Sequence, residues 1–132
     1  MPTILVNKAQ QRIYILDNQT VLASAPCSTG KGTPSPYGQG TTPAGLYRIT
    51  GIWKGGDVAK ILDPTGRWNP YGPYVADLDV ETRQLAIHGT SEPDTLGQPV
   101  TAGCIRISND LLSRLVKDRL LTQGTLVNIV ED

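Results

Sequence analysis

Glycine and proline recur so often along this chain that short helices and strands are favoured over long ones. The 132 residues contain 14 glycines and 10 prolines, and phenylalanine is absent. Glycine adopts backbone conformations that other residues avoid, and proline lacks a backbone donor, so both concentrate in turns. The stretch 30–45 alone holds five glycines and three prolines, and we expect an irregular loop there. The sequence therefore predicts short strands joined by many turns.

Between these turns, apolar and polar residues alternate with the period of two that is typical of strands. Ile13 and Ile15, for example, alternate with Arg12 and Tyr14. The first three segments are separated by polar turns, which predicts an antiparallel meander. We expect strands at 3–7, 12–16, 21–28, 46–49, 74–78, 84–87, 104–107 and 126–130, a turn at 79–82 and irregular structure at 61–72.

One segment near the C-terminus has the pattern of a helix instead. Ser108 is a good N-cap, and Asp110 places a negative charge in the first turn. Leucines and a valine three and four residues apart form one apolar stripe, and Gly124 ends the segment. We predict one principal α-helix at about 109–122. Residues 1–132 are then a single, mainly β domain.

Charge and composition exclude several classes of function. Twelve basic residues balance twelve acidic ones, so nucleic acid and anionic membranes are not expected partners. No apolar stretch approaches the roughly 20 residues of a membrane span. Residues 1–7 lack the features of a signal peptide, which fits either a cytoplasmic protein or a mature or trimmed form. One histidine and two distant cysteines predict no metal site, and no cofactor is expected.

The only histidine, His88, lies sixteen residues before Cys104, and glycine-rich turns surround both. A thiol needs a base to become a nucleophile at neutral pH, and imidazole is well matched to that task. Strand alternation would direct Ile105 and Ile107 to the core, and Cys104 with Arg106 to the opposite, accessible face. By the same alternation, His88 points away from the core. The pair is therefore a candidate nucleophile and base.

The residues around Cys104 fit this chemistry. The small Gly103 would let the backbone N–H groups of Gly103 and Cys104 converge on an oxyanion. Arg106 could favour the thiolate or hold a substrate carboxylate. Structural roles stay open for all of them, because lone cysteines and histidines are often core residues. For Cys27, buried core filling is the preferred interpretation.

Several ordered motifs identify a family. They are the hairpin 4–14, Cys27-Ser28-Thr29-Gly30, Thr42-Pro43-Ala44-Gly45-Leu46-Tyr47-Arg48-Ile49, His88-Gly89-Thr90, Gly103-Cys104-Ile105-Arg106-Ile107 and Gly124-Thr125-Leu126-Val127-Asn128-Ile129. In this order the set resembles YkuD-type L,D-transpeptidase catalytic domains over nearly the whole chain. The resemblance implies a β-sandwich of mixed strands with few helices, which agrees with the pattern of the chain.

The resemblance also implies an activity. Cys104 would attack the carbonyl that joins the third-position diamino acid of a peptidoglycan stem tetrapeptide to D-alanine, forming a thioester. His88 would take the thiol proton and protonate the leaving amine, and the Gly89 carbonyl would orient the ring. An amine acceptor would then resolve the thioester by cross-linking or exchange. Such a protein would work in the cell wall or periplasm, as a monomer with stem peptides as partners and with carbapenems as inhibitors.

One departure from the family pattern affects this site. The family usually has a second histidine before the Gly-Cys pair, and Ala102 stands there in this chain. Weaker candidates for substrate contact are Thr90 and Tyr74, with Tyr71 as a neighbouring aromatic. The alternatives to a transpeptidase are an L,D-carboxypeptidase, in which water resolves the thioester, and a non-catalytic peptidoglycan-binding module. A third is a redox or structural domain in which Cys27 pairs with Cys104.

Overall fold

The computed structural model describes residues 2–34, 39–81 and 83–132, so parts of the predicted loop 30–45 and turn 79–82 lie outside it. Strands Tyr74–Leu78 and Leu126–Val130 begin and end where the sequence predicted. The elements in chain order are β1 Pro2–Asn7, β2 Arg12–Asp17, β3 Thr20–Pro26, β4 Gly45–Lys54, α1 Gly55–Leu62, β5 Tyr74–Leu78, β6 Ala86–His88, η1 Pro93–Thr95, β7 Ile105–Arg106, α2 Asn109–Lys117 and β8 Leu126–Val130.

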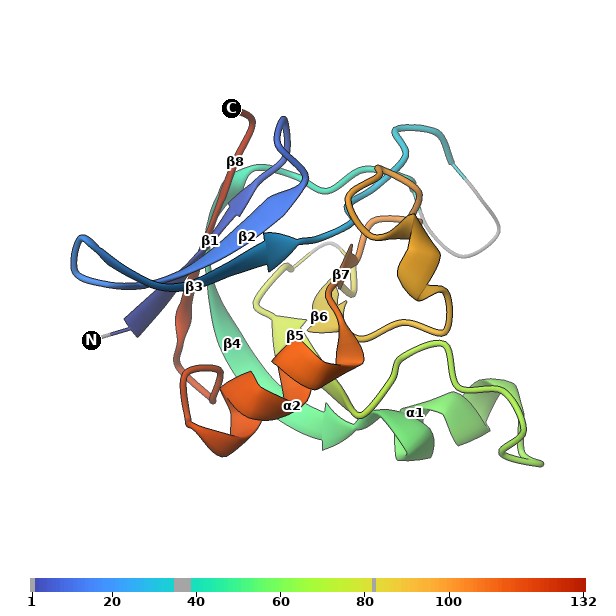
Figure 1. Ribbon diagram of the computed structural model, residues 1–132. Coiled ribbons are helices and arrows are strands. Elements are labelled where there is room, and N and C mark those ends of the chain that lie inside the picture. Colours follow the sequence, from blue (N-terminus) through green and yellow to red (C-terminus); the bar gives the residue numbers. More distant parts are fainter. Residues whose placement is uncertain (1, 35–38, 82) are drawn as a thin grey trace.

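The strands of the described residues join in one curled, mixed sheet in the order β3-β2-β1-β8-β4-β5-β6-β7. Strands β1, β2 and β3 form the predicted antiparallel meander. The pairs β1–β8 and β6–β7 are parallel, whereas β4 pairs antiparallel with β8 and with β5. Figure 1 shows how the long strand β4 passes from the N-terminal strands to the short strands β5, β6 and β7.

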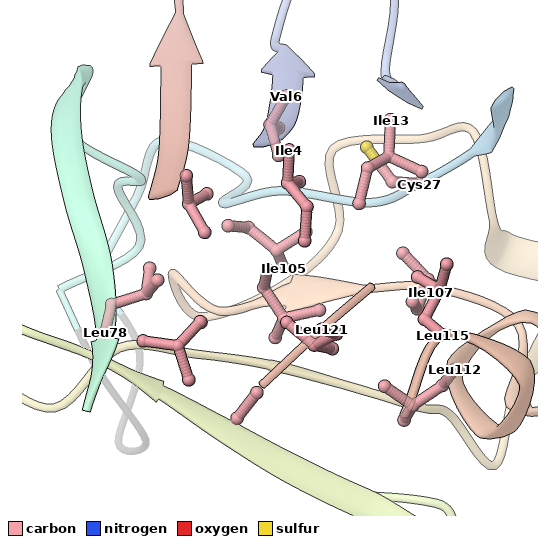
Figure 2. Close-up of a cluster of buried hydrophobic side chains, with 14 of the residues drawn as sticks. Ile4, Val6, Ile13, Cys27, Leu78, Ile105, Ile107, Leu112, Leu115 and Leu121 are labelled. Carbon is pink, nitrogen blue, oxygen red and sulfur yellow. The ribbon is translucent and has the colours of Figure 1, made fainter. Parts of the chain in front are cut away.

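The core lies inside this curl, because both halves of the sheet contribute side chains to it. Ile4 and Ile13 come from β1 and β2, and Ile105 comes from β7 (Figure 2). Leu112 and Leu115 join them from the apolar stripe of α2. Burying each such side chain stabilises the fold by about 1.5–3 kcal/mol. This core fixes the strands β5–β7, whose other face carries the site described below.

Helix α2 begins as predicted and ends early. The Ser108 hydroxyl accepts a hydrogen bond from the Leu111 N–H at 3.1 Å, which is the expected N-cap. The helix ends at Lys117 rather than near residue 122, because Arg119 adopts a left-handed conformation with φ of 58°. The N–H groups of Leu120 and Leu121 both turn back to the Leu115 carbonyl.

A second helix, α1, corrects the prediction of one principal helix. It starts at Gly55, where a Cβ atom would lie 2.0 Å from the Gly72 carbonyl oxygen. This close approach fixes the start of α1 against the loop that precedes β5. Within the described residues, no helix has the length and apolar character needed to cross a membrane.

Candidate active site

The outer face of strands β4–β7 carries the residues that the sequence singled out. In register, Trp53 pairs with Val75, Val75 with His88, and His88 with Arg106. Directly paired residues point to the same face of a sheet, so these side chains form one row across four strands. The predicted alternation is confirmed for Ile105 and Ile107, which are buried in the core. The strand is shorter than the predicted 104–107, and Cys104, which precedes it, is partly exposed but also packs against the core.

Cys104 is held by hydroxyl groups on both sides of its backbone. The Thr101 hydroxyl donates to the Cys104 carbonyl at 2.7 Å, and the Thr42 hydroxyl donates to the Gly103 carbonyl at 2.6 Å. Gly103 has a φ of 140°, and a Cβ there would lie 2.9 Å from the Thr41 carbonyl oxygen. Only glycine meets both conditions without strain. The thiol is therefore carried on a fixed backbone.

His88 is more enclosed than the sequence suggested, with 5% of its surface exposed. Its Nδ1 lies 2.7 Å from the Gly89 carbonyl oxygen. A carbonyl can only accept, so Nδ1 carries the proton of the neutral ring and Nε2 is left with its lone pair. The Tyr71 ring packs against the imidazole edge to face, with centroids 5.1 Å apart. The ring is thereby oriented as a proton acceptor.

Asn109, the first residue of α2, clamps the loop that follows His88. Its Oδ1 accepts from the Thr90 N–H at 2.9 Å, and its Nδ2 donates to the Thr90 carbonyl at 3.0 Å. A Cβ on Gly89 would lie 2.0 Å from the same Oδ1. The Gly89 N–H in turn donates to the Tyr71 carbonyl at 2.7 Å. Sequence reasoning assigned Asn109 to the helix alone, because this contact depends on tertiary packing.

Burial keeps both reactive groups neutral. Burial, helped by the positive charge of Arg106 and opposed by the hydrogen bond to Gly89, lowers the pKa of His88 from 6.5 to about 4. Burial also raises the pKa of the Cys104 thiol. A backbone hydrogen bond from Ala86 and the charge of Arg106 act in the opposite direction. At neutral pH the resting pair is a thiol and a neutral imidazole.

Two cavities meet at Cys104 and His88. The first has a volume of about 700 Å³, and the second of about 630 Å³. Both are lined by Tyr71, Gln84 and Leu85 as well as by the pair itself. The thiol can therefore be approached from two sides. The first cavity is also lined by Lys31, Trp68, Arg83, Glu92, Ala102 and Arg106, and the second by Trp53, Lys54, Asp57, Val58, Ile61 and Asp77.

The remaining predicted site residues fall into two groups. Arg106 lines the first cavity and lies 4.0 Å from a Glu92 carboxylate oxygen. Thr90, by contrast, is buried, and its hydroxyl accepts from the Glu92 N–H at 2.8 Å, which is a local turn contact. Tyr74 packs against the core and lines neither cavity, so Tyr71 is the tyrosine of this site.

Two further sequence expectations concern the cysteines and the oxyanion donors. Cys27 is buried in the core, as predicted, and both cysteines are free, which contradicts a Cys27–Cys104 disulfide.

The Gly103 N–H, a predicted oxyanion donor, already donates a hydrogen bond to the Thr101 hydroxyl at 3.0 Å. Among the residues that the structure describes, no three His, Cys, Asp or Glu side chains gather as a metal site would require.

The fold and the site together define a mainly β protein with a thiol and an oriented imidazole between two cavities. The chain belongs to the YkuD family, the L,D-transpeptidase catalytic domain, because the model of this family matches residues 1–129. YkuD of Bacillus subtilis (strain 168), which is named as an L,D-transpeptidase, is 37% identical over 82 residues. That alignment covers 54% of this chain and 49% of the relative.

Solved structures confirm the fold. The L,D-transpeptidase of Xylanimonas cellulosilytica superposes with a TM-score of 0.71 at 18% identity, covering 98% of this chain and 60% of that one. The LD transpeptidase LdtMt1, solved in complex with imipenem, gives a TM-score of 0.65 at 17% identity, covering 98% and 58%. This chain thus spans about half to three fifths of the length of these relatives.

Proposed function

We propose that this chain is a cysteine acyl-transferase that acts on peptidoglycan stem tetrapeptides. It forms a thioester at Cys104, releases D-alanine and transfers the acyl group to an amine. The observation that carries the proposal is the shared lining of both cavities by Cys104 and by His88, whose Nδ1 is fixed on the Gly89 carbonyl. Membership in the L,D-transpeptidase family supports the reaction class.

The protonation states of the pair support a stepwise proton relay. His88 Nε2 takes the thiol proton as Sγ bonds to the substrate carbonyl carbon, so no stable thiolate is needed beforehand. The imidazolium then gives this proton to the departing amine of D-alanine. The low pKa of His88, about 4, makes its conjugate acid a strong donor at that moment. Gly89 stabilises the imidazolium through its carbonyl.

The oxyanion of the tetrahedral intermediate needs donors close to Sγ. The Cys104 N–H is the proposed main donor, since the Gly103 N–H must first leave the Thr101 hydroxyl before it can join. Tyr71 is the proposed second donor in place of Tyr74. The pKa of its hydroxyl is raised by burial and by the nearby Cys104, which keeps the group protonated.

The first cavity suits the acyl donor. Its cations Lys31, Arg83 and Arg106 outnumber Glu92, so it favours the carboxylates that a stem peptide carries. Arg83 is oriented by hydrogen bonds to the Thr41 carbonyl and hydroxyl at 2.5 and 3.0 Å. The second cavity leaves the opposite side of the thioester open to an acceptor. We place this reaction in the cell wall or periplasm, where the stem peptides are.

Imipenem and a natural donor test this function together. Incubation with imipenem should add one inhibitor mass to the intact wild-type protein and none to Cys104→Ala, while Cys27→Ala should still be labelled. Incubation with disaccharide tetrapeptide should then yield a cross-linked dimer, or an exchanged stem when a D-amino acid is added. Tripeptide alone would instead assign an L,D-carboxypeptidase. Folded wild-type protein that gains no mass would contradict the thioester and favour a non-catalytic binding module.

A further inference from the structure

Trp53 is an exposed aromatic side chain that is nevertheless fixed. Its exposure is 57%, yet its Nε1 donates to the Asp77 Oδ2 at 2.8 Å. A Cβ on Gly51 would lie 3.6 Å from the ring, so one side of the indole lies over that glycine. Exposed tryptophan normally has several rotamers to lose on binding. Here the ring is already oriented, which is the property of a preformed binding surface.

This surface adjoins the reactive pair. Trp53, Asp77, His88 and Cys104 all line the second cavity. Trp53 lies in the row of His88, separated from it by Val75, and Asp77 pairs with the small Ala86 on the neighbouring strand. If the β6–β7 register is continued by one pair, Ala86 faces Cys104, which sets Asp77 and Cys104 about two strand spacings, or ~10 Å, apart. An amine bound at Trp53 and Asp77 therefore needs only a short movement within the second cavity to reach the thioester carbon.

The two cavities differ in charge across Cys104. Asp77, which lines the second cavity, raises the pKa of the thiol. Arg106 and Arg83, which line the first cavity, lower it. Among the described lining residues, the second cavity holds two carboxylates and one ammonium group, and the first holds three cations and one carboxylate. These residues are Asp57, Asp77 and Lys54 in the second, and Lys31, Arg83, Arg106 and Glu92 in the first.

We propose that Trp53 and Asp77 bind the amine acceptor in its primary ammonium form and thereby favour transfer over hydrolysis. The inference rests on the proposed function and names the residues that select its second substrate. An ammonium group is attracted both to the face of an indole ring and to a carboxylate beside it. Water has no charge, so neither residue gives it the same advantage.

The bound acceptor then reacts in balanced steps. The ammonium group first loses one proton to water, which releases the neutral amine from Asp77 and lets it move within the second cavity to the thioester. Its nitrogen bonds to the thioester carbonyl carbon, and the carbon–Sγ bond breaks. His88 Nε2 takes the second amine proton and passes it to Sγ, which restores the thiol and the neutral imidazole. Trp53 and Asp77 touch the acceptor but not the reacting carbon, so they affect acceptor binding and leave acylation by the donor intact.

The test measures how the acyl-enzyme partitions. Disaccharide tetrapeptide serves as donor and D-methionine as the acceptor probe, and the exchanged stem and the tripeptide are quantified together. Asp77→Asn keeps an oxygen that can accept from Trp53 Nε1 and loses only the charge. Trp53→Leu removes the aromatic face. Leu46→Ala is the control, because Leu46 is an exposed apolar residue of the same strand β4 and lines neither cavity.

We expect Asp77→Asn and Trp53→Leu to raise the D-methionine concentration for half-maximal exchange about 10-fold, which corresponds to the loss of one charge or cation–π contact. Acylation by imipenem should not be slower in Asp77→Asn, since a charge that raises the thiol pKa is gone. Leu46→Ala should partition like wild type. The inference is overturned if both variants partition normally, if Leu46→Ala loses exchange equally, or if the acyl-enzyme forms but D-methionine never resolves it. A protein that imipenem does not label would refute the proposed function instead.

Discussion

Holding His88 neutral should make the stability of this protein depend on pH. Burial lowers the pKa of His88 from 6.5 to about 4, so between these values the unfolded chain binds a proton that the folded chain does not. The free energy of unfolding should therefore rise as the pH increases from about 4 to 6.5 and then level off. A difference of about 2.5 pKa units corresponds to about 3 kcal/mol. This is a large share of the total stability of a small domain.

The comparison of wild type with His88→Gln isolates this contribution, because carboxylates titrate in both proteins over the same pH range. Glutamine is polar and uncharged, so it removes the titration while it keeps a side chain that can donate to the Gly89 carbonyl. Urea unfolding at pH 4.5 and at pH 7 should show a loss of stability that is about 2–3 kcal/mol greater for wild type. Equal losses in the two proteins would refute the inference that His88 is buried in its neutral form.

Three further changes test the positioning of the pair. His88→Ala should slow imipenem acylation at least ~100-fold in a folded protein, and an unchanged rate would remove His88 from the mechanism. Gly89→Ala places a Cβ 2.0 Å from Asn109 Oδ1, so it should cost less stability in an Asn109→Ala background than in wild type; additive losses would disprove this contact. Cys27→Ser puts a hydroxyl in the core at a site with no exposure. It should lower the free energy of unfolding by about 1–3 kcal/mol while labelling by imipenem persists, and a loss of labelling would contradict a purely structural Cys27.

The strands and α2 could be predicted because their signals are local. Period-two alternation with flanking turn residues located β5 and β8, and Ser108 with the following apolar stripe located the start of α2. Helix α1 gives no such signal. It begins with Gly55 and Gly56, which are poor helix formers, and its start depends on contact with Gly72, far along the chain.

The same distinction applies to the site. Cys104 and His88 could be singled out because the chain has one histidine and because glycine surrounds both residues. The parts played by Asn109, Tyr71 and Asp77 follow from strand register and from loop packing, which no local pattern encodes. The sequence alone does not distinguish Tyr71 from Tyr74 as the tyrosine that contacts substrate, because both lie close to His88 in the chain. Only the fold shows that Tyr74 packs against the core.

Ala102 stands where the family resemblance places a second histidine, and the contacts around it show that the position of the thiol does not depend on this side chain. The Ala102 carbonyl accepts from the Gly40 N–H at 2.8 Å, a contact that any side chain at this position preserves. The Cys104 backbone is held by Thr101 and Thr42, not by residue 102. A smaller side chain therefore enlarges the first cavity without loosening the thiol. Because His88 is the only imidazole in the chain, the proposed proton transfers to and from Sγ and to the leaving amine all depend on it.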